Sequence, residues 1–318
     1  MKKWPRMWRL VARNKGGVGV ALLFSMWLAA YLAADRTWLT GLLFFIPTPV
    51  CAVLVGAWSL VVFRRSRWLG ILGLVACALP VFSMFFVENH WGQRAGDAPT
   101  AKPLKLVHWN IWYEHLGRES IHACLRAEHA DVYVLSEVPS WTDVGALGRS
   151  FGAGYRGLRL GDMAIIARGE VRSVGETNAG NAKACLVDWQ ADGCSLKLLA
   201  VDIPSNPFEW RVPMLRKICA FAADRQADII VGDFNTPRRS VALRSLPEGY
   251  VHAYDAVGAG WSYTWPEGLP CLAIDQCILG PRVFPVSYRL RSPWLSDHRM
   301  QVLEFALSVA GEEKMAQE

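Results

Sequence analysis

The chain has 318 residues, 52% of them hydrophobic, with a formal net charge of +6 and a mean hydropathy of +0.17. That length suits one large domain plus a smaller unit, and the apolar fraction is high for a wholly soluble protein. Residues 1–100 carry 11 Lys and Arg against 3 Asp and Glu, a net of +8, whereas residues 101–318 carry 23 against 25, a net of −2. The second part therefore lacks the overall basic character that favours nucleic-acid binding, although a local basic patch stays open.

Three long apolar runs occupy residues 16–34, 37–63 and 68–87. Each is long enough to cross a hydrocarbon core of about 30 Å as a helix, so the sequence predicts three transmembrane helices within residues 16–87. The second run contains Pro47 and Pro49, which predict a kink or a late helix start. The alternative is a signal peptide followed by buried core helices, but a signal's apolar region is shorter and is not followed by two more spans.

Positive charge flanks these runs unevenly. A basic segment, residues 1–15, precedes the first run, and Arg64, Arg65 and Arg67 separate the second from the third. The positive-inside rule predicts a cytoplasmic N-terminus, so three crossings of a bacterial inner or plasma membrane make the rest extracytoplasmic. The lipid bilayer is then a partner, and no protein partner is predicted. Residues 88–102 suit a linker, and residues 309–318 form a C-terminal tail.

Six of the eight cysteines follow residue 102. An extracytoplasmic location permits disulfides, and Cys185/Cys194 and Cys271/Cys277 are the pairs nearest in sequence. Free buried thiols are equally compatible, and the chain has no Cys/His spacing typical of zinc.

Strand-like and helix-like segments alternate after residue 102. The expected strands are 104–111, 131–135, 163–167, 184–189, 196–203, 228–231, 272–279 and 300–307, and the expected helices are 120–130 and 211–225. Polar side chains recur where these strands end, and clustered strand ends are where α/β folds build sites. The recurring residues are Asn110, Glu137, Asp233, Asn235, Asp275, Asp297 and His298.

A single aspartate after a strand is usually a turn or capping residue, but the joint occurrence of these seven favours a site. Oxygen ligands suit hard cations, so Mg²⁺ or Mn²⁺ is the expected cofactor. Magnesium polarises phosphoryl oxygens, and an Asp/His pair can activate water.

Five motifs resemble those of the endonuclease/exonuclease/phosphatase superfamily, over residues 103–308. They are LKLVHWNIWYEH (104–115), DVYVLSEVP (131–139), DIIVGDFNTP (228–237), AIDQCIL (273–279) and SDHRMQVLEF (296–305). A TWP motif at 264–266 resembles that of membrane-anchored bacterial members. The resemblance implies an α/β fold, a four-layer αββα sandwich with two mixed sheets, preceded here by the three membrane helices. It also implies hydrolysis of a phosphodiester or phosphomonoester.

The resemblance also implies roles for individual residues. Glu137 resembles the main metal ligand, with Asn110 and Asp297 close to the same ion. Asp233 and Asn235 resemble the pair that orients the attacking water and binds the phosphate. His298 resembles the histidine that contacts the scissile phosphate, and Asp275 resembles its carboxylate partner.

Three further residues are candidates for substrate binding. Asp202 stands where the family often has a histidine or tyrosine, and an aspartate there would repel phosphate unless it binds metal or stays protonated. Arg211 could reach a phosphate or be a solvent-exposed arginine at a helix start. Trp265 could stack on substrate or pack beneath the site. Trp112 and Tyr113 could line the cleft or pack at the strand edge, and His108 is assigned no role.

The favoured interpretation is a membrane-anchored phosphoester hydrolase, whose substrate is a lipid, a nucleic acid or a small molecule. Tethering raises the effective concentration near lipid headgroups. One alternative is a catalytically impaired binding or sensory protein on the same fold, motivated by Asp202. The other is a transporter, which three helices without intramembrane charge serve poorly.

Overall fold

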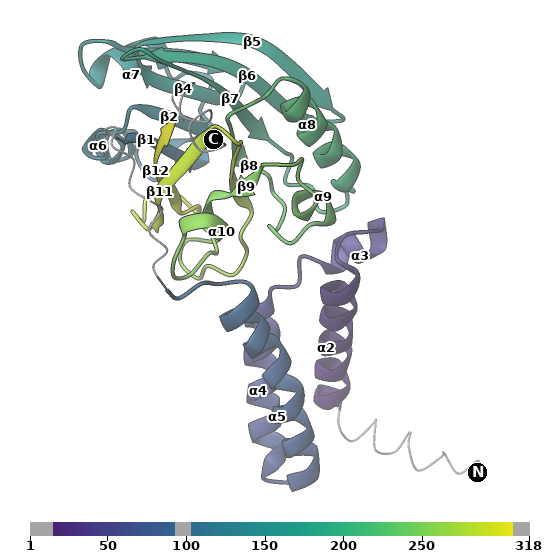
Figure 1. Cartoon of the computed structure of the whole chain (residues 1–318). Helices are drawn as coiled ribbons and strands as arrows, with labels where there is room; N and C mark the ends of the chain where they lie inside the picture. The colour runs from purple at the N-terminus through teal and green to yellow at the C-terminus, as the bar shows by residue number, and fades with distance from the viewer. Residues whose placement is uncertain (1–14, 93–102, 308–318) are drawn as a thin grey trace. The chain divides into compact units, whose positions relative to one another are not determined.

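The computed structural model of the chain describes residues 15–92 and 103–307 (Figure 1). The segment 1–14, most of the expected linker and the expected C-terminal tail lie outside the described residues. The chain divides into two compact units. The first comprises Met1–Asn89 with Pro207–Trp210, and the second comprises His90–Asn206 with Arg211–Glu318.

Apolar helices make up the first unit. They are α2 (Lys15–Ala33), α3 (Trp38–Leu43), α4 (Thr48–Phe63), α5 (Arg67–Phe82) and the π-helical turn η1 (Ser83–Val87). The second apolar run is thus two helices, because α3 ends at Leu43 and α4 begins directly after Pro47. The late start expected from Pro47 and Pro49 is confirmed, since proline suits the first turn of a helix but not its interior.

Two helices of the described residues, Gly16–Ala33 and Arg67–Val87, are long and apolar enough to cross a membrane. A further apolar helix, Thr48–Phe63, is shorter than these two. The two long spans are only 17% and 22% buried. Helices α4 and α5 lie very close together, since a Cβ at Gly73 would come within 2.2 Å of Ser59 Oγ. Small residues at such contacts are typical of packed membrane helices.

The second unit is an α/β fold with two mixed six-stranded sheets, which confirms that part of the expectation. The first sheet has the order β11 (Val283–Arg291), β12 (Met300–Leu307), β1 (Leu104–Asn110), β2 (Val132–Ser136), β4 (Met163–Arg168) and β3 (Tyr155–Leu160). The second has the order β5 (Glu170–Ala179), β6 (Ala182–Ala191), β7 (Cys194–Asp202), β8 (Ile229–Asp233), β10 (Asp275–Leu279) and β9 (Val251–His252).

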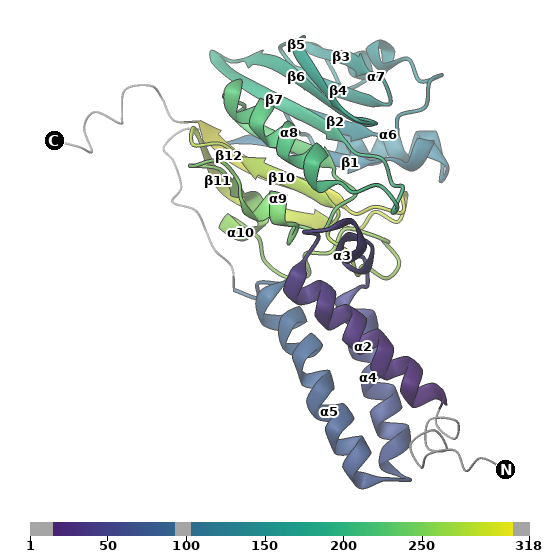
Figure 2. The same cartoon turned by 90° about the vertical axis from the view of Figure 1, so that its right-hand side faces the viewer.

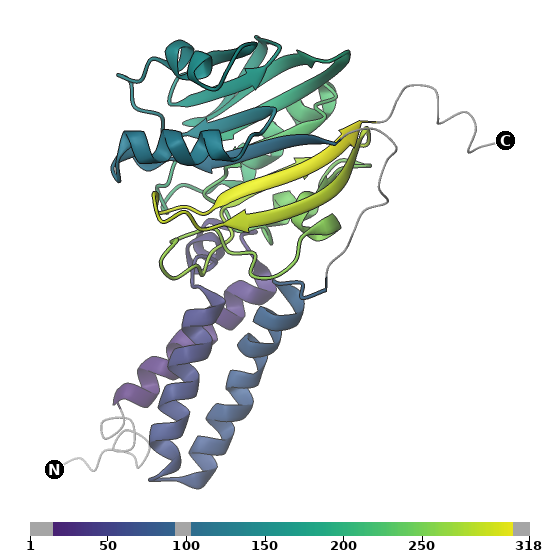
Figure 3. The same cartoon turned by 90° about the vertical axis from the view of Figure 1, so that its left-hand side faces the viewer.

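Three apolar clusters bury the faces of these sheets. The largest contains residues of both sheets, such as Val134 and Val231, so the sheets pack face to face. On the outer face of the first sheet pack α6 (Arg118–Ala127) and α7 (Val144–Ser150) (Figure 3). On the outer face of the second pack α8 (Val212–Asp224) and α9 (Val241–Arg244) (Figure 2). A short helix, α10 (Ala253–Val257), contacts β11.

The expected central strands are present, with ends shifted by a few residues. Strand β10 begins at Asp275 rather than at 272, because Leu272 instead pairs with Trp265. The sequence missed β3, β5 and β11. These strands are interrupted by exposed charged residues such as Arg156, Glu170 and Arg289, so they lack the apolar pattern that marked the buried strands.

The strand directions explain where the polar residues meet. Strands β1 and β2 are parallel, as are β7 and β8, so their carboxyl ends point the same way within each sheet. Strands β12 and β10 run antiparallel to β1 and β8, so their first residues lie at those same ends. Asp275 is consequently opposite Asp233 in register, and Asp233 is opposite Asp202.

Candidate active site

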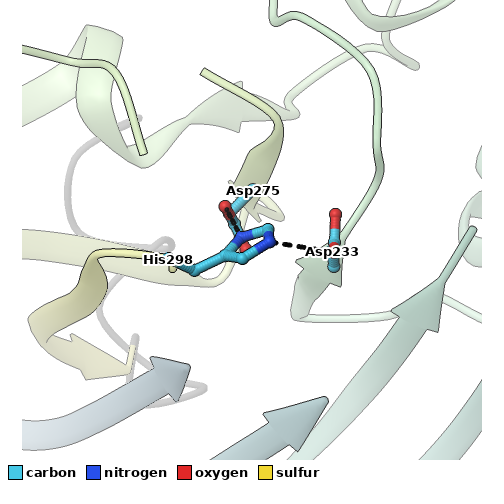
Figure 4. Close-up of side chains that lie close together, drawn as sticks. All are labelled: Asp233, Asp275 and His298. Carbon is cyan, nitrogen blue, oxygen red and sulfur yellow. Dashed lines mark hydrogen bonds and ion pairs between the residues drawn. The ribbon is translucent and has the colours of Figure 1, made fainter. Parts of the chain in front are cut away.

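Asp233, Asp275 and His298 form a buried cluster at this end of the sheets (Figure 4). One ligand atom from each lies within 4.8 Å of the others. His298 Nδ1 is 2.9 Å from Asp275 Oδ2, and His298 Nε2 is 3.8 Å from Asp233 Oδ2. The imidazole therefore lies between two carboxylates.

The backbone around His298 is held on both sides. Its N–H donates to Ser296 Oγ at 3.1 Å, and the Ser296 hydroxyl donates to the Asn110 carbonyl at 2.7 Å. Its carbonyl accepts from Trp109 Nε1 at 2.8 Å. Because Trp109 and Asn110 belong to β1, the imidazole is fixed relative to that strand.

The cluster perturbs its own protonation. Burial lowers the pKa of His298, but Asp275 and Asp233 outweigh it and raise that pKa to about 10. Burial and the neighbouring Asp275 raise the pKa of Asp233 to about 8. Burial alone would raise the pKa of Asp275, yet the charge and hydrogen bond of His298 bring it below its ordinary value. His298 and Asp275 thus form an imidazolium beside a carboxylate at neutral pH.

Asn110 and Glu137 lie next to this cluster. The Asn110 amide donates to Asp233 Oδ2 at 3.0 Å and also hydrogen-bonds the Glu137 side chain. Burial raises the pKa of Glu137, and the carboxylates of Asp297 and Asp275 add to the effect. The structure therefore brings both residues to the site.

Asp297 is oriented by Trp265. The indole Nε1 donates to Asp297 Oδ2 at 3.0 Å, and the Asp297 carbonyl accepts from Glu267 N at 2.7 Å. Trp265 is half-buried. The sequence expected Trp265 to stack or to pack, and it missed that the ring holds an acidic side chain.

Asn235 and Asp202 occupy the neighbouring strand ends. Asn235 N donates to Asp233 Oδ1 at 2.8 Å, and its amide donates to the Ile203 carbonyl at 2.9 Å. Burial, Glu137 and Asp162 raise the pKa of Asp202 to about 6. Asp202 is thus protonated in part near neutral pH.

Arg211 lies at the start of α8 but is only 4% exposed, so the alternative of a solvent-exposed arginine is wrong. Its guanidinium donates to the carbonyls of Pro204 and Asn206. These contacts tie down the loop after β7.

His108, which was assigned no role from the sequence, lies next to Asp275. Gln301 Nε2 donates to His108 Nδ1 at 2.7 Å, and Tyr288 donates to Gln301 Oε1 at 2.6 Å. His108 Nδ1 is 3.9 Å from Asp275 Oδ1, and burial lowers the pKa of His108 to about 4. The signal was its position two residues before Asn110, on the same face of the strand.

Residues 107–298 match the sequence model of the Endonuclease/Exonuclease/phosphatase family. This chain belongs to that family. Its members hydrolyse phosphoester bonds, so the protein is a hydrolase of phosphoric esters. No curated protein sequence matches the chain.

Solved structures of the family share the fold. A humanized D. rerio TDP2 is 19% identical, with a TM-score of 0.51 over 65% of this chain and 100% of that chain. D. rerio TDP2 complexed with a single-strand DNA product is 18% identical over the same shares, also at 0.51. A family protein from Bacteroides thetaiotaomicron is 12% identical, at 0.50 over 66% and 100%. At these identities the likeness shows the fold alone.

The family is typically dependent on divalent metal, and the residues at the site fit such an ion. The donor set is rich in carboxylate and amide oxygens, which hard cations prefer. Buried carboxylates with raised pKa values, such as Glu137 and Asp233, gain most from a nearby cation.

All eight cysteines are free thiols, and Cys194 is the exposed one. Neither Cys185/Cys194 nor Cys271/Cys277, the pairs nearest in sequence, is bridged in this structure, in agreement with the free-thiol alternative.

Proposed function

We propose that this protein is a membrane-anchored, Mg²⁺- or Mn²⁺-dependent phosphoester hydrolase. The observation that carries the proposal is the position of His298 between Asp275 and Asp233, beside Asn110 and Glu137. Glu137, Asn110 and Asp297 would hold the cation. When bound, the cation supplies positive charge that offsets the negative charge of the phosphate.

The chain's own residues divide the remaining work. Asp233, with Asn235 bonded to it, orients the attacking water and, in its ionised form, accepts the proton of that water. His298 Nε2 faces Asp233, and its imidazolium stabilises negative charge on the phosphate oxygens. Asp275 holds the imidazole in that orientation and keeps it protonated. Trp265 keeps Asp297 in place.

A direct assay tests this function. The detergent-solubilised chain would be incubated with Mg²⁺, Mn²⁺ or a chelator and offered bis(p-nitrophenyl) phosphate, DNA, RNA and phospholipid. We expect metal-dependent hydrolysis that Glu137→Ala and His298→Ala each reduce by several orders of magnitude. Absence of turnover on every substrate, or variants equal to wild type, would reject the proposal.

The membrane anchor is supported by the first unit's surface. Its two long helices are mostly unburied, and large apolar side chains such as Leu32, Val75 and Phe86 are 66–71% exposed. A water-exposed surface of this kind is unusual in a soluble protein. We propose that α2, α4 and α5 with η1 lie in the bilayer, although α4 spans only about 24 Å at 1.5 Å per residue.

Charge bias supports an extracytoplasmic hydrolase unit, with the N-terminus and the loop at Arg64 in the cytoplasm. Cysteine labelling from outside intact cells would report the side on which exposed Cys194 lies. Labelling only after cell lysis would overturn this orientation without affecting the enzymatic proposal.

A further inference from the structure

A strained turn follows β1 directly. Trp112, Tyr113 and Glu114 are three consecutive non-glycine residues with φ of 46°, 49° and 60°. L-residues rarely adopt this left-handed conformation, and a run of three is costly. Such strain persists only where the surroundings enforce it, and it concentrates at functional sites.

A buried carboxylate enforces this turn. Glu114 is 8% exposed. Its oxygens accept from Arg118 Nε at 2.8 Å, His122 Nε2 at 2.7 Å and Thr142 Oγ1 at 3.3 Å. The carboxylate is thereby tied to α6 and to the loop after β2. These partners fix the turn on two neighbouring elements.

The same turn touches the proposed metal ligands. Trp112 N–H donates to Asn110 Oδ1 at 2.9 Å, and Tyr113 N–H donates to the Glu137 carbonyl at 2.9 Å. The turn therefore lies at the rim of the site, and its backbone positions two site residues.

The side chains of Trp112 and Tyr113 are exposed, unlike that of Glu114. Trp112 is 36% exposed and Tyr113 is 38% exposed. His115 meets both rings edge-on, with centroids 5.2 Å and 6.2 Å away. Strand-edge packing would bury these rings, so it does not explain why the chain sustains strain here. Both rings contact His115 and keep part of their surface free.

We propose that Trp112 and Tyr113 bind the organic group of the substrate, and that this group is flat and unsaturated. The inference rests on the proposed function, because it places that group beside a phosphate bound at Glu137 and His298. Aromatic side chains stack on flat groups with little loss of conformational freedom, so two exposed rings on a backbone turn fixed at the rim of the site favour such groups.

Binding of unreactive or slowly reacting diesters tests the inference without relying on turnover. Calorimetry on the full chain with Mg²⁺ would compare diphenyl phosphate, dicyclohexyl phosphate and dimethyl phosphate. We expect diphenyl phosphate to bind about tenfold more tightly than either of the others. Dicyclohexyl phosphate matches the aryl ester in size but lacks a flat face.

Variants show which residues produce the preference for the aryl ester. Trp112→Leu keeps apolar bulk and should lower the preference for diphenyl over dicyclohexyl phosphate at least about fivefold, as should Tyr113→Ala. Trp112→Phe keeps a flat ring and should restore most of the preference. Phe284→Ala removes an aromatic residue that is 51% exposed at the far end of β11, and it should change nothing.

The outcomes separate the two proposals. Equal binding of the aryl and cyclohexyl esters, unchanged selectivity in folded Trp112→Leu and Tyr113→Ala, or no diester binding at all would overturn the inference. Circular dichroism would establish that each variant is folded. If Trp112→Leu and Tyr113→Ala do not fold, Trp112→Phe remains as the test. That variant keeps a flat ring, so a loss of its selectivity would count against stacking. Selective binding without hydrolysis of any ester would count against the proposed function only.

Discussion

His298 donates through Nδ1 to Asp275 at 2.9 Å, in a pair whose side chains are 6% and 0% exposed. The two residues come from segments 23 positions apart. The pair places a positive charge deep in the site, and Asp275 is what maintains it. Removing the Asp275 carboxylate should therefore change both the reaction rate and its dependence on pH.

Asp275→Asn should lower kcat by about 10²- to 10⁴-fold. It should also shift the alkaline limb of the pH–rate profile downward. In wild type the pKa of His298 is about 10, so the imidazolium persists well above neutral pH. Without Asp275, burial dominates and the imidazole loses its proton at lower pH. Asp188→Asn, in a surface ion pair with Arg172, is the control. An unshifted limb would contradict the assigned partnership.

Asp202→Asn should raise kcat/KM by several-fold at pH 8 and have little effect at pH 5. The pKa of Asp202 is about 6, so the wild-type side chain becomes an added negative charge above that pH. Asparagine stays neutral throughout. Parallel pH–rate profiles measure the ratio, and Asp202→His tests whether a cation there helps further. If Asp202→Asn instead weakens Mg²⁺ activation, Asp202 is a metal ligand.

Trp265→Phe should raise the Mg²⁺ concentration needed for half-maximal activity by about 10-fold or more, while activity at saturating Mg²⁺ falls less. The change removes the N–H that holds Asp297 Oδ2 and keeps an aromatic ring. Trp261→Phe removes an indole donor bonded to the Pro270 carbonyl and should leave the metal dependence unaltered. Identical Mg²⁺ titrations for the Trp265 variant and wild type would refute this role.

His252 should make the hydrolase unit less stable in acid. Burial lowers the pKa of His252 to about 4, below the ordinary 6.5. Between those values the unfolded chain binds a proton that the folded chain does not, so stability falls as pH falls through this window. The loss from this residue is on the order of 3 kcal/mol. Denaturant melts of wild type and His252→Gln from pH 7 to pH 4 measure it. A variant that remains as acid-sensitive as wild type would exclude His252 as the cause.

Much of the sheet architecture could be predicted from the sequence. Buried strands such as β2 and β8 are almost continuous apolar runs, and a local pattern of that kind is sufficient to mark them. Edge strands such as β5 could not be predicted, because their exposed faces carry the same polar residues as loops. The late start of α4 was predictable, because proline restricts its own backbone.

The composition of the candidate site was predictable to a similar degree. Asn110, Glu137 and Asp233 each follow an apolar strand, and their motifs in sequence order marked the family. The contacts among them were not predictable. Arg211 is a buried support for a loop, and Trp265 holds Asp297, although neither interaction leaves a trace in the local sequence.

The sequence by itself determined which side chains end the central strands, where the apolar helices lie and to which family the chain belongs. These properties depend on residue order and on patterns repeated over a few positions. Only the tertiary structure decided that Trp112 and Tyr113 stand exposed on a strained turn, because that turn is held by Glu114 through contacts with distant residues. A left-handed backbone at non-glycine residues has no local sequence signal, since its cost is met by contacts that form only when the chain has folded.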